Sequence, residues 1–293
     1  MNEIKRVSEK TSNRILNSVF FGGGTPSLIE PSIIGDGLNE IQKHWKTKNN
    51  FEVTLEANPG SVDAKNFKAY KEAGVNRTSM GIQSLNTKDL KALGRTHTVE
   101  EALAAFEIAR QNFKAVSFDL IYARQNQNIS QWEKELSLAL SLEASHMSLY
   151  QLTIEQGTAF GDRYNRGLLK GLPNDDTSAD MYDLTLSLCE DRGLVSYEVS
   201  NYAHEGYESI HNLIYWRYGD YIGIGPGAHG RLTIDGKKYA TETVLSPEAW
   251  LKKVECDGSG ESNSVVLTDQ QQAAEFIMMG LRLKEGINYQ RFK

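Results

Sequence analysis

The sequence predicts an α/β fold built on parallel strands, either a βα-barrel or an open α/β sheet. Short runs of β-branched and aromatic residues alternate with longer amphipathic stretches, which is typical of repeated β-α units. Connections of this length join parallel strands by right-handed crossovers. In addition, a glycine-rich turn or a polar side chain follows each apolar run, as at the functional end of a βα-barrel.

The individual elements follow from these patterns in chain order. Strands are predicted at residues 18–21, 51–55, 77–81, 115–121 and 146–152. Helices are predicted at residues 31–44, 63–73, 99–112, 130–142, 178–192 and 268–283. Gly74 and Gly193 stand where helix C-caps are expected, and Ser61 and Ser130 where N-caps are expected. The alternation breaks near residues 202–209, which predicts a soft boundary there.

The composition is that of an ordinary globular chain. Its 293 residues are 40% hydrophobic and 24% charged, with a formal net charge of -6. No apolar run approaches the roughly 20 residues that span a bilayer, and the first residues carry no apolar signal segment. The acidic balance argues against a nucleic-acid surface. Two cysteines, far apart in sequence, exclude a disulfide scaffold and favour a reducing compartment, which we expect to be the cytoplasm.

The first chemical candidate is the turn in Val19-Phe20-Phe21-Gly22-Gly23-Gly24-Thr25-Pro26-Ser27. Consecutive glycines let a backbone approach a ligand with its N–H groups unshielded, and Pro26 fixes the exit from the turn. The segment has neither the ending of a phosphate-binding P-loop nor the glycine spacing of a dinucleotide fold. Taken alone, it could equally be a tight strand-to-helix turn.

The second candidate is the series of polar groups at the strand ends. The glycine turn is followed in order by Glu56, Gln83, Asp119 and Gln151. Any one of these could be a cap or a solvated side chain. Together they are expected to converge on one mouth suited to a polar, zwitterionic ligand.

Motifs along nearly the whole chain resemble the HemN/HemW group of radical S-adenosylmethionine (SAM) proteins. They are, in order, FFGGGTPS, TLEANPG, MGIQSLN, LGRTH, FDLIY, YEVSNYA, HNLIYW and GIGPGAHGR. The HNLIYW motif favours the HemW heme-chaperone branch over oxygen-independent coproporphyrinogen III oxidases. The resemblance implies an incomplete parallel βα-barrel of the radical SAM type at residues 1–200. A smaller α+β extension with a truncated C-terminal domain is implied at residues 201–293.

The resemblance also implies roles for the strand-end residues. Gly23, Gly24 and Thr25 would line the methionine moiety of SAM. Glu56 would accept hydrogen bonds from SAM, and Gln83, Arg95 and Asp119 would complete the polar surround. These roles suit the chemistry, because an ammonium group needs acceptors and a carboxylate favours a guanidinium. For Arg95, a surface salt bridge is the alternative.

In the HNLIYW motif, the resemblance makes His211 a candidate axial ligand to heme iron. A neutral imidazole is a good ligand for this metal, and the flanking aromatic side chains could stack on a porphyrin. The alternative is that His211 forms an internal hydrogen bond while Tyr215 and Trp216 pack in the core. His229 is expected to make a backbone or packing contact near SAM rather than to bind a metal.

The [4Fe–4S] cluster of the family requires three cysteine thiolates, which relatives supply in a CxxxCxxC loop. These 293 residues hold only Cys189 and Cys256, so the ligands of the cluster are missing and no metal site is predicted. We therefore expect SAM to bind weakly. The family's Gly-Leu-Pro is replaced by Ala123-Arg124-Gln125, which puts the adenosine pocket in doubt. The chain is expected to be either a truncated gene product or a degenerate relative.

Three functions follow from the resemblance. The first is a HemW-like heme chaperone that binds heme and passes it to heme proteins. Membrane-associated proteins could be among these acceptors. The second is an oxygen-independent coproporphyrinogen III oxidase-like enzyme of porphyrin biosynthesis. The third is an inactive SAM- or heme-binding remnant. Whether the chain is an enzyme stays open, and no catalytic residue is assigned.

Overall fold

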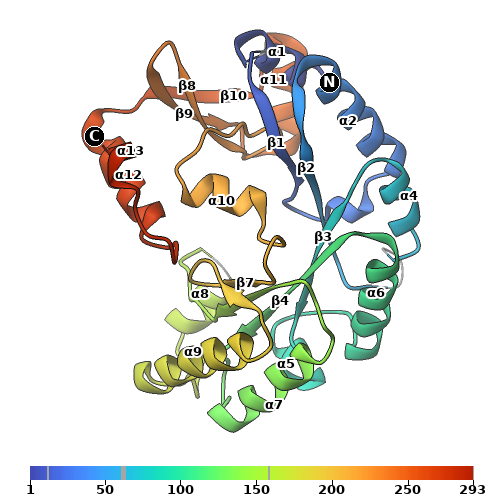
Figure 1. Ribbon diagram of the computed structural model, residues 1–293, viewed down its shortest axis with the longest axis vertical. Coiled ribbons are helices and arrows are strands. Elements are labelled where there is room, and N and C mark those ends of the chain that lie inside the picture. Colours follow the sequence, from blue (N-terminus) through green and yellow to red (C-terminus); the bar gives the residue numbers. More distant parts are fainter. Residues whose placement is uncertain (12, 61–63, 158, 293) are drawn as a thin grey trace. The chain divides into compact units, whose positions relative to one another are not determined.

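The computed structural model describes residues 1–11, 13–60, 64–157 and 159–292 (Figure 1). The predicted N-cap Ser61 and the first residue of the predicted helix 63–73 lie outside the described residues. The chain forms two compact units, neither of which is continuous in sequence. Unit 1 comprises Met1–Phe20, Glu30–Val53 and Ser209–Lys293, and unit 2 comprises Phe21–Ile29 and Thr54–Glu208. The change from unit 2 to unit 1 between Glu208 and Ser209 falls inside the soft boundary predicted at residues 202–209. The predicted division into domains at residues 1–200 and 201–293 stays a prediction.

The main sheet confirms all five predicted strands. Its seven strands are β1 (Ile15–Phe21), β2 (Lys46–Ala57), β3 (Arg77–Gln83), β4 (Ala115–Tyr122), β5 (His146–Gln151), β6 (Val195–Ser196) and β7 (Asn201–Ala203). The order is β1-β2-β3-β4-β5-β7-β6. Pairing is parallel from β2 to β5, as predicted, and β7 then pairs antiparallel with both β5 and β6. The fold is therefore α/β with an antiparallel end.

The connections of unit 2 are mostly helices. They are η1 (Pro26–Leu28), α4 (Phe67–Glu72), α5 (Thr87–Ala92), α6 (Val99–Asn112), α7 (Ile129–Leu140), α8 (Ala159–Asn165) and α9 (Asp175–Glu190). Gly74 and Gly193 follow helices with φ of 111° and 74°, the left-handed conformation expected for C-cap glycines. The predicted cap Ser130 is wrong. Asn128 is the N-cap of α7, because its side chain accepts from the Gln131 N–H while the Gln131 side chain accepts from the Asn128 N–H.

The sheet in unit 2 has a helix-covered apolar face and a polar face. Met80, Ile82, Phe118 and Leu120 are fully buried on the apolar face, and they alternate along β3 and β4 with polar or less buried residues. The buried Trp132 of α7 donates from Nε1 to Thr185 Oγ1 of α9 at 2.8 Å. Packing of the helices on the apolar face thus fixes the strands, and the candidate site residues lie on the polar face.

Unit 1 contains a second, smaller sheet. Its remaining elements are α1 (Asn2–Thr11), α2 (Pro31–His44), α10 (Ile210–Trp216), β8 (His229–Ile234), β9 (Lys237–Thr243), α11 (Pro247–Asp257), β10 (Glu261–Val266), α12 (Asp269–Gly280) and α13 (Tyr289–Phe292). The antiparallel order is β10-β9-β8. This arrangement is the α+β character expected of the extension. Within the described part of the chain, no helix is both long and apolar enough to cross a membrane.

Candidate functional site

The glycine turn lies between β1 and η1 with its backbone exposed. Gly23 and Gly24 have φ of 79° and 61°, and a Cβ added to either would meet no atom within 4 Å. The buried Tyr70 holds the turn from its far end, with its hydroxyl 2.7 Å from Ser27 O and 2.6 Å from Ile29 O. Thr25 is the residue before η1, and its side chain makes no capping hydrogen bond. The turn is therefore anchored, while its glycine backbone stays unshielded by side-chain carbons on the side away from Tyr70.

Glu56 and Asp119 share the polar face of the sheet. Gly23 N–H donates to Glu56 Oε2 at 3.1 Å, which ties the end of β2 to the glycine turn. Burial raises the pKa of Asp119 to about 7, and the negative charge of Glu56 adds to that rise. Hydrogen bonds from Ser148 and Ser79 and the positive charge of Arg95 act in the opposite direction. The structure thus brings the predicted residues Glu56, Asp119 and Arg95 together in unit 2.

Gln83 ends β3 in a conformation that few side chains adopt. Its φ is 72°, and the register of β3 on β4 shifts between Met80 and Gln83. A Cβ at Gly81 would lie 3.1 Å from Gln83 Nε2, so glycine at that position leaves room for the amide. Non-glycine residues in left-handed backbone cluster at ligand sites. This outlier supports the prediction that Gln83 contacts a ligand.

The register of β5 places Tyr150 and Gln151 on opposite faces of the sheet, and the predicted site role of Gln151 stays a prediction. Asp119 pairs with Ser148 and Ile121 with Tyr150, whereas Gln151 pairs with Tyr122 on the apolar face. Burial raises the pKa of Tyr150 to about 12, with a further contribution from the Asp119 charge. Side chains alternate between the two faces of a strand, so Tyr150 lies on the same face as Ser148, the partner of Asp119. The sequence pattern pointed instead to Gln151, the last polar residue of the run.

His211 lies in unit 1, at the start of the short helix α10. The N-cap Ser209 accepts from the Asn212 N–H at 3.3 Å. The buried Glu52 carboxylate accepts from the N–H groups of Ile210 and His211 at 3.2 and 3.0 Å, and from Ser209 Oγ at 3.4 Å. A carboxylate stabilises a helix N-terminus. Glu52, which the sequence analysis missed, therefore fixes the backbone that carries His211.

The His211 imidazole packs between aromatic rings. It stacks on Phe20 at 4.3 Å between centroids with an interplanar angle of 22°, and Tyr215 meets it edge-on at 4.7 Å. Burial lowers the pKa of His211 to about 4, so the ring is neutral near pH 7. Across the described residues we find no hydrogen bond to either ring nitrogen. The predicted internal hydrogen bond is therefore not seen, and the ring has the protonation state that a metal ligand needs.

The other residues of the motif are not fully buried. The residues of α10 are only partly buried. Tyr215 lies 4.2 Å from Tyr221 between centroids, and the Arg282 guanidinium lies 4.4 Å from the Trp216 ring. Tyr215 and Trp216 are therefore not fully packed in a core. Core packing was the alternative to stacking on a porphyrin. The His229 side chain is 62% exposed and approaches Glu242 at 4.0 Å. Its predicted place near SAM stays a prediction.

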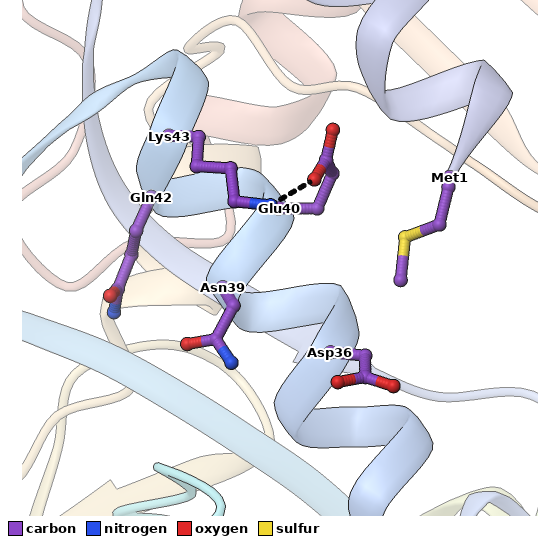
Figure 2. Close-up of a pocket in the computed structure, with 6 residues that line it drawn as sticks. All are labelled: Met1, Asp36, Asn39, Glu40, Gln42 and Lys43. Carbon is purple, nitrogen blue, oxygen red and sulfur yellow. Dashed lines mark hydrogen bonds and ion pairs between the residues drawn. The ribbon is translucent and has the colours of Figure 1, made fainter.

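A separate surface depression lies along α2, lined by Met1, Asp36, Asn39, Glu40, Gln42 and Lys43 (Figure 2). Figure 2 shows Met1 apart from the other labelled side chains, which α2 carries, and Lys43 Nζ lies 2.9 Å from a Glu40 carboxylate oxygen. The depression contains none of the predicted site residues, and its lining is that of a solvated charged face. It is therefore not the candidate site.

Comparison with known proteins places the chain in a family. Residues 1–139 match the radical SAM superfamily, and residues 267–293 match the HemN C-terminal domain. Heme chaperone HemW of Haemophilus influenzae is 39% identical over 99% of this chain and 74% of its own length. The chain belongs to the HemW family of radical SAM proteins.

Two further relatives extend the comparison. The mitochondrial radical S-adenosyl methionine domain-containing protein 1 of Danio rerio is 41% identical to this HemW-family chain over 95% of the chain. The chain spans 64% of that relative. Coproporphyrinogen III oxidase (HemN) of Escherichia coli superposes with a TM-score of 0.80 at 18% identity, over 99% of the chain and 69% of HemN. This likeness confirms the fold class, an incomplete radical SAM βα-barrel.

Membership in the radical SAM superfamily implies both SAM and a [4Fe–4S] cluster, and the residues present fit them unequally. The open glycine turn, Glu56 and Arg95 suit the charged groups of SAM. Cys189 is buried in α9, where burial raises its thiol pKa to about 12, and Cys256 is exposed in α11 of the other unit. Among the described residues no three histidine, cysteine or carboxylate side chains form a metal-binding group. The cluster therefore has no fitting ligand set in these residues.

Proposed function

We propose that this chain is a HemW-type heme chaperone, which binds heme through His211 and delivers it to heme-accepting proteins. The proposal includes SAM as a weakly held ligand of unit 2 and the cytoplasm as the compartment of action. Heme transfer needs a ligand that binds iron but can release it. A single histidine on a short helix meets that requirement better than a buried two-ligand cage.

The observation that carries the proposal is the state of the His211 ring. It is neutral, stacked on Phe20, and free of hydrogen bonds to described residues at both nitrogens. Its backbone is held by Glu52, so the ring is placed without using its nitrogens. Relatives that carry the name heme chaperone HemW support the same assignment. When heme is bound, its iron would accept an electron pair from this imidazole.

Unit 2 supplies the second part of the proposal. The N–H groups of Gly24 and Thr25 would face the carboxylate of SAM, and Glu56, which also accepts from Gly23 N–H, would accept from the ammonium group of SAM. The Asp119 carboxyl, with its pKa raised to about 7, can change protonation near neutral pH. Arg95 would pair with a carboxylate of the ligand, since its side chain lies close enough to influence Asp119.

Hemin titration of the purified chain tests the heme assignment. We expect a saturable Soret shift, and we expect His211→Ala to weaken binding at least about tenfold, or about 1.4 kcal/mol. His44→Ala is the matched control, because His44 lies in the same unit on α2 and contacts Glu40 at 3.1 Å. The absence of a shift with the parent chain would overturn the chaperone proposal. An equal affinity of the His211 and His44 variants would remove His211 as the ligand.

A further inference from the structure

A buried ion-pair network lies behind the polar face of unit 2. The Arg124 side chain is 4% exposed and the Glu135 side chain 9% exposed. Arg124 Nη2 donates to Asp89 Oδ2 at 2.9 Å and also to Glu135 Oε2, and Nη1 donates to Ile121 O. One guanidinium therefore joins the end of β4, helix α5 and helix α7. Its planar fork suits several acceptors at once.

The second oxygen of Glu135 holds the chain directly after Gln83. Glu135 Oε1 accepts from Ser84 Oγ at 2.6 Å and from Leu85 N–H at 2.7 Å. Ser84 Oγ in turn accepts from Asn86 N–H at 3.0 Å, where Asn86 caps α5. Two of the three residues that follow Gln83 are thus bound directly to one carboxylate, and Asn86 is joined to it through Ser84.

The same network supports the loop that differs from the family pattern. Ala123 and Asn126 have φ of 55° and 59°, so the loop turns sharply on both sides of Arg124. Gln125 Nε2 donates to Lys170 O at 2.8 Å, and Gln127 Nε2 donates to Glu135 Oε2 at 3.3 Å. The loop is consequently well anchored.

These contacts bear on two predicted ligand residues. Gln83 has φ of 72°, a conformation that persists only where its surroundings hold it. Arg95 follows α5, and its N–H donates to Leu90 O at 2.8 Å, so the Asp89 contact fixes the helix that leads to it. A buried ion pair is weak evidence for stability in itself. Here the Glu135 carboxylate of the ion pair also accepts hydrogen bonds from Ser84 and Leu85, which follow Gln83.

We propose that Arg124 and Glu135 are positioning residues, which hold Gln83 in its left-handed conformation and so shape the ligand face of unit 2. The inference rests on the proposed SAM role of Gln83 for its functional meaning. Neither residue needs to touch the ligand, because Glu135 acts through Ser84 and Leu85. The loop of Ala123-Arg124-Gln125 is then held by an ion pair.

Hydrogen exchange of the full chain tests the positioning directly. We expect Glu135→Ala to accelerate amide exchange in residues 83–86 at least about tenfold, since Leu85 N–H loses its acceptor. Glu133→Ala is the control, because Glu133 is exposed on the same helix. Arg124→Lys is the second variant should Glu135→Ala fail to fold, because lysine keeps the charge but cannot replace the fork. Exchange in both variants equal to that of the control would overturn the proposal.

SAM calorimetry supplies the second measurement. Glu135→Ala and Gln83→Ala should each weaken SAM binding by about tenfold or less, and the double variant should lose no more than Gln83→Ala alone. Additive losses would contradict positioning through Gln83. If the parent chain does not bind SAM, the proposed SAM role is overturned, while the exchange experiment still decides whether Arg124 and Glu135 hold Gln83.

Discussion

Replacing Asp119 with asparagine should raise the free energy of unfolding at pH 8 by about 2 kcal/mol and leave it nearly unchanged at pH 4. The folded pKa of about 7 exceeds the ordinary value of 3.8. Between these values the unfolded chain has released the proton that the folded chain retains, so wild-type stability falls as pH rises. The difference between the two pKa values, about 3, corresponds to about 4 kcal/mol. The expected effect is about half of this, because the side chain is half-buried and solvent screens part of the interaction.

Urea denaturation at pH 4, 5.5, 7 and 8 measures this difference. Asp36→Asn is the control, since Asp36 is exposed on α2. The gain from Asp119→Asn should grow through the range up to pH 7 and then level off. A loss of stability that is the same at every pH would mean that the carboxyl group acts only through its hydrogen bonds with Ser148 and Ser79.

Removing the Glu52 carboxylate should lower the free energy of unfolding by about 3 kcal/mol. Glu52→Ala leaves the N–H groups of Ile210 and His211 without their acceptor, and each such loss costs about 1–3 kcal/mol when buried. Glu52→Gln should lose less, because its amide oxygen can still accept. The hemin affinity of Glu52→Ala should also fall, since α10 loses the contact that places His211.

Glu30→Ala is the matched control for Glu52. Glu30 occupies the N-cap position of α2, but its side chain makes no capping hydrogen bond. Its replacement should change the unfolding free energy by less than about 0.5 kcal/mol, as is usual for surface positions. Equal effects of the two substitutions in chemical denaturation would show that Glu52 does not anchor α10.

Strand positions were predictable because apolar runs of the right length have few alternatives in a βα chain. The end of a strand is harder to predict. Tyr150 and Gln151 both follow the apolar part of β5, and only the register against β4 shows that Tyr150 shares a face with Asp119. The N-cap of α7 was predicted wrongly for a similar reason. Asn128 and Ser130 are both good N-cap residues, and the capping box with Gln131 forms only when Asn128 is the cap.

Long-range contacts explain what the sequence could not predict. Glu52 lies more than 150 residues before His211, and nothing near either residue indicates that one holds the other. Arg124 looked like a departure from the family, whereas the structure pairs it with Asp89 and Glu135. Sequence patterns therefore predicted candidate ligand residues, and the structure was needed to find the residues that hold them.

Imidazole rescue tests most directly whether His211 is the heme ligand. His211→Gly removes the ring beside Phe20, and the space that it leaves could admit free imidazole. We expect this variant to lose the optical spectrum of the histidine-bound hemin complex and to regain it as imidazole is added. His44→Gly should keep the parent spectrum without imidazole. A His211→Gly complex that retains the parent spectrum before imidazole is added would contradict heme binding through His211.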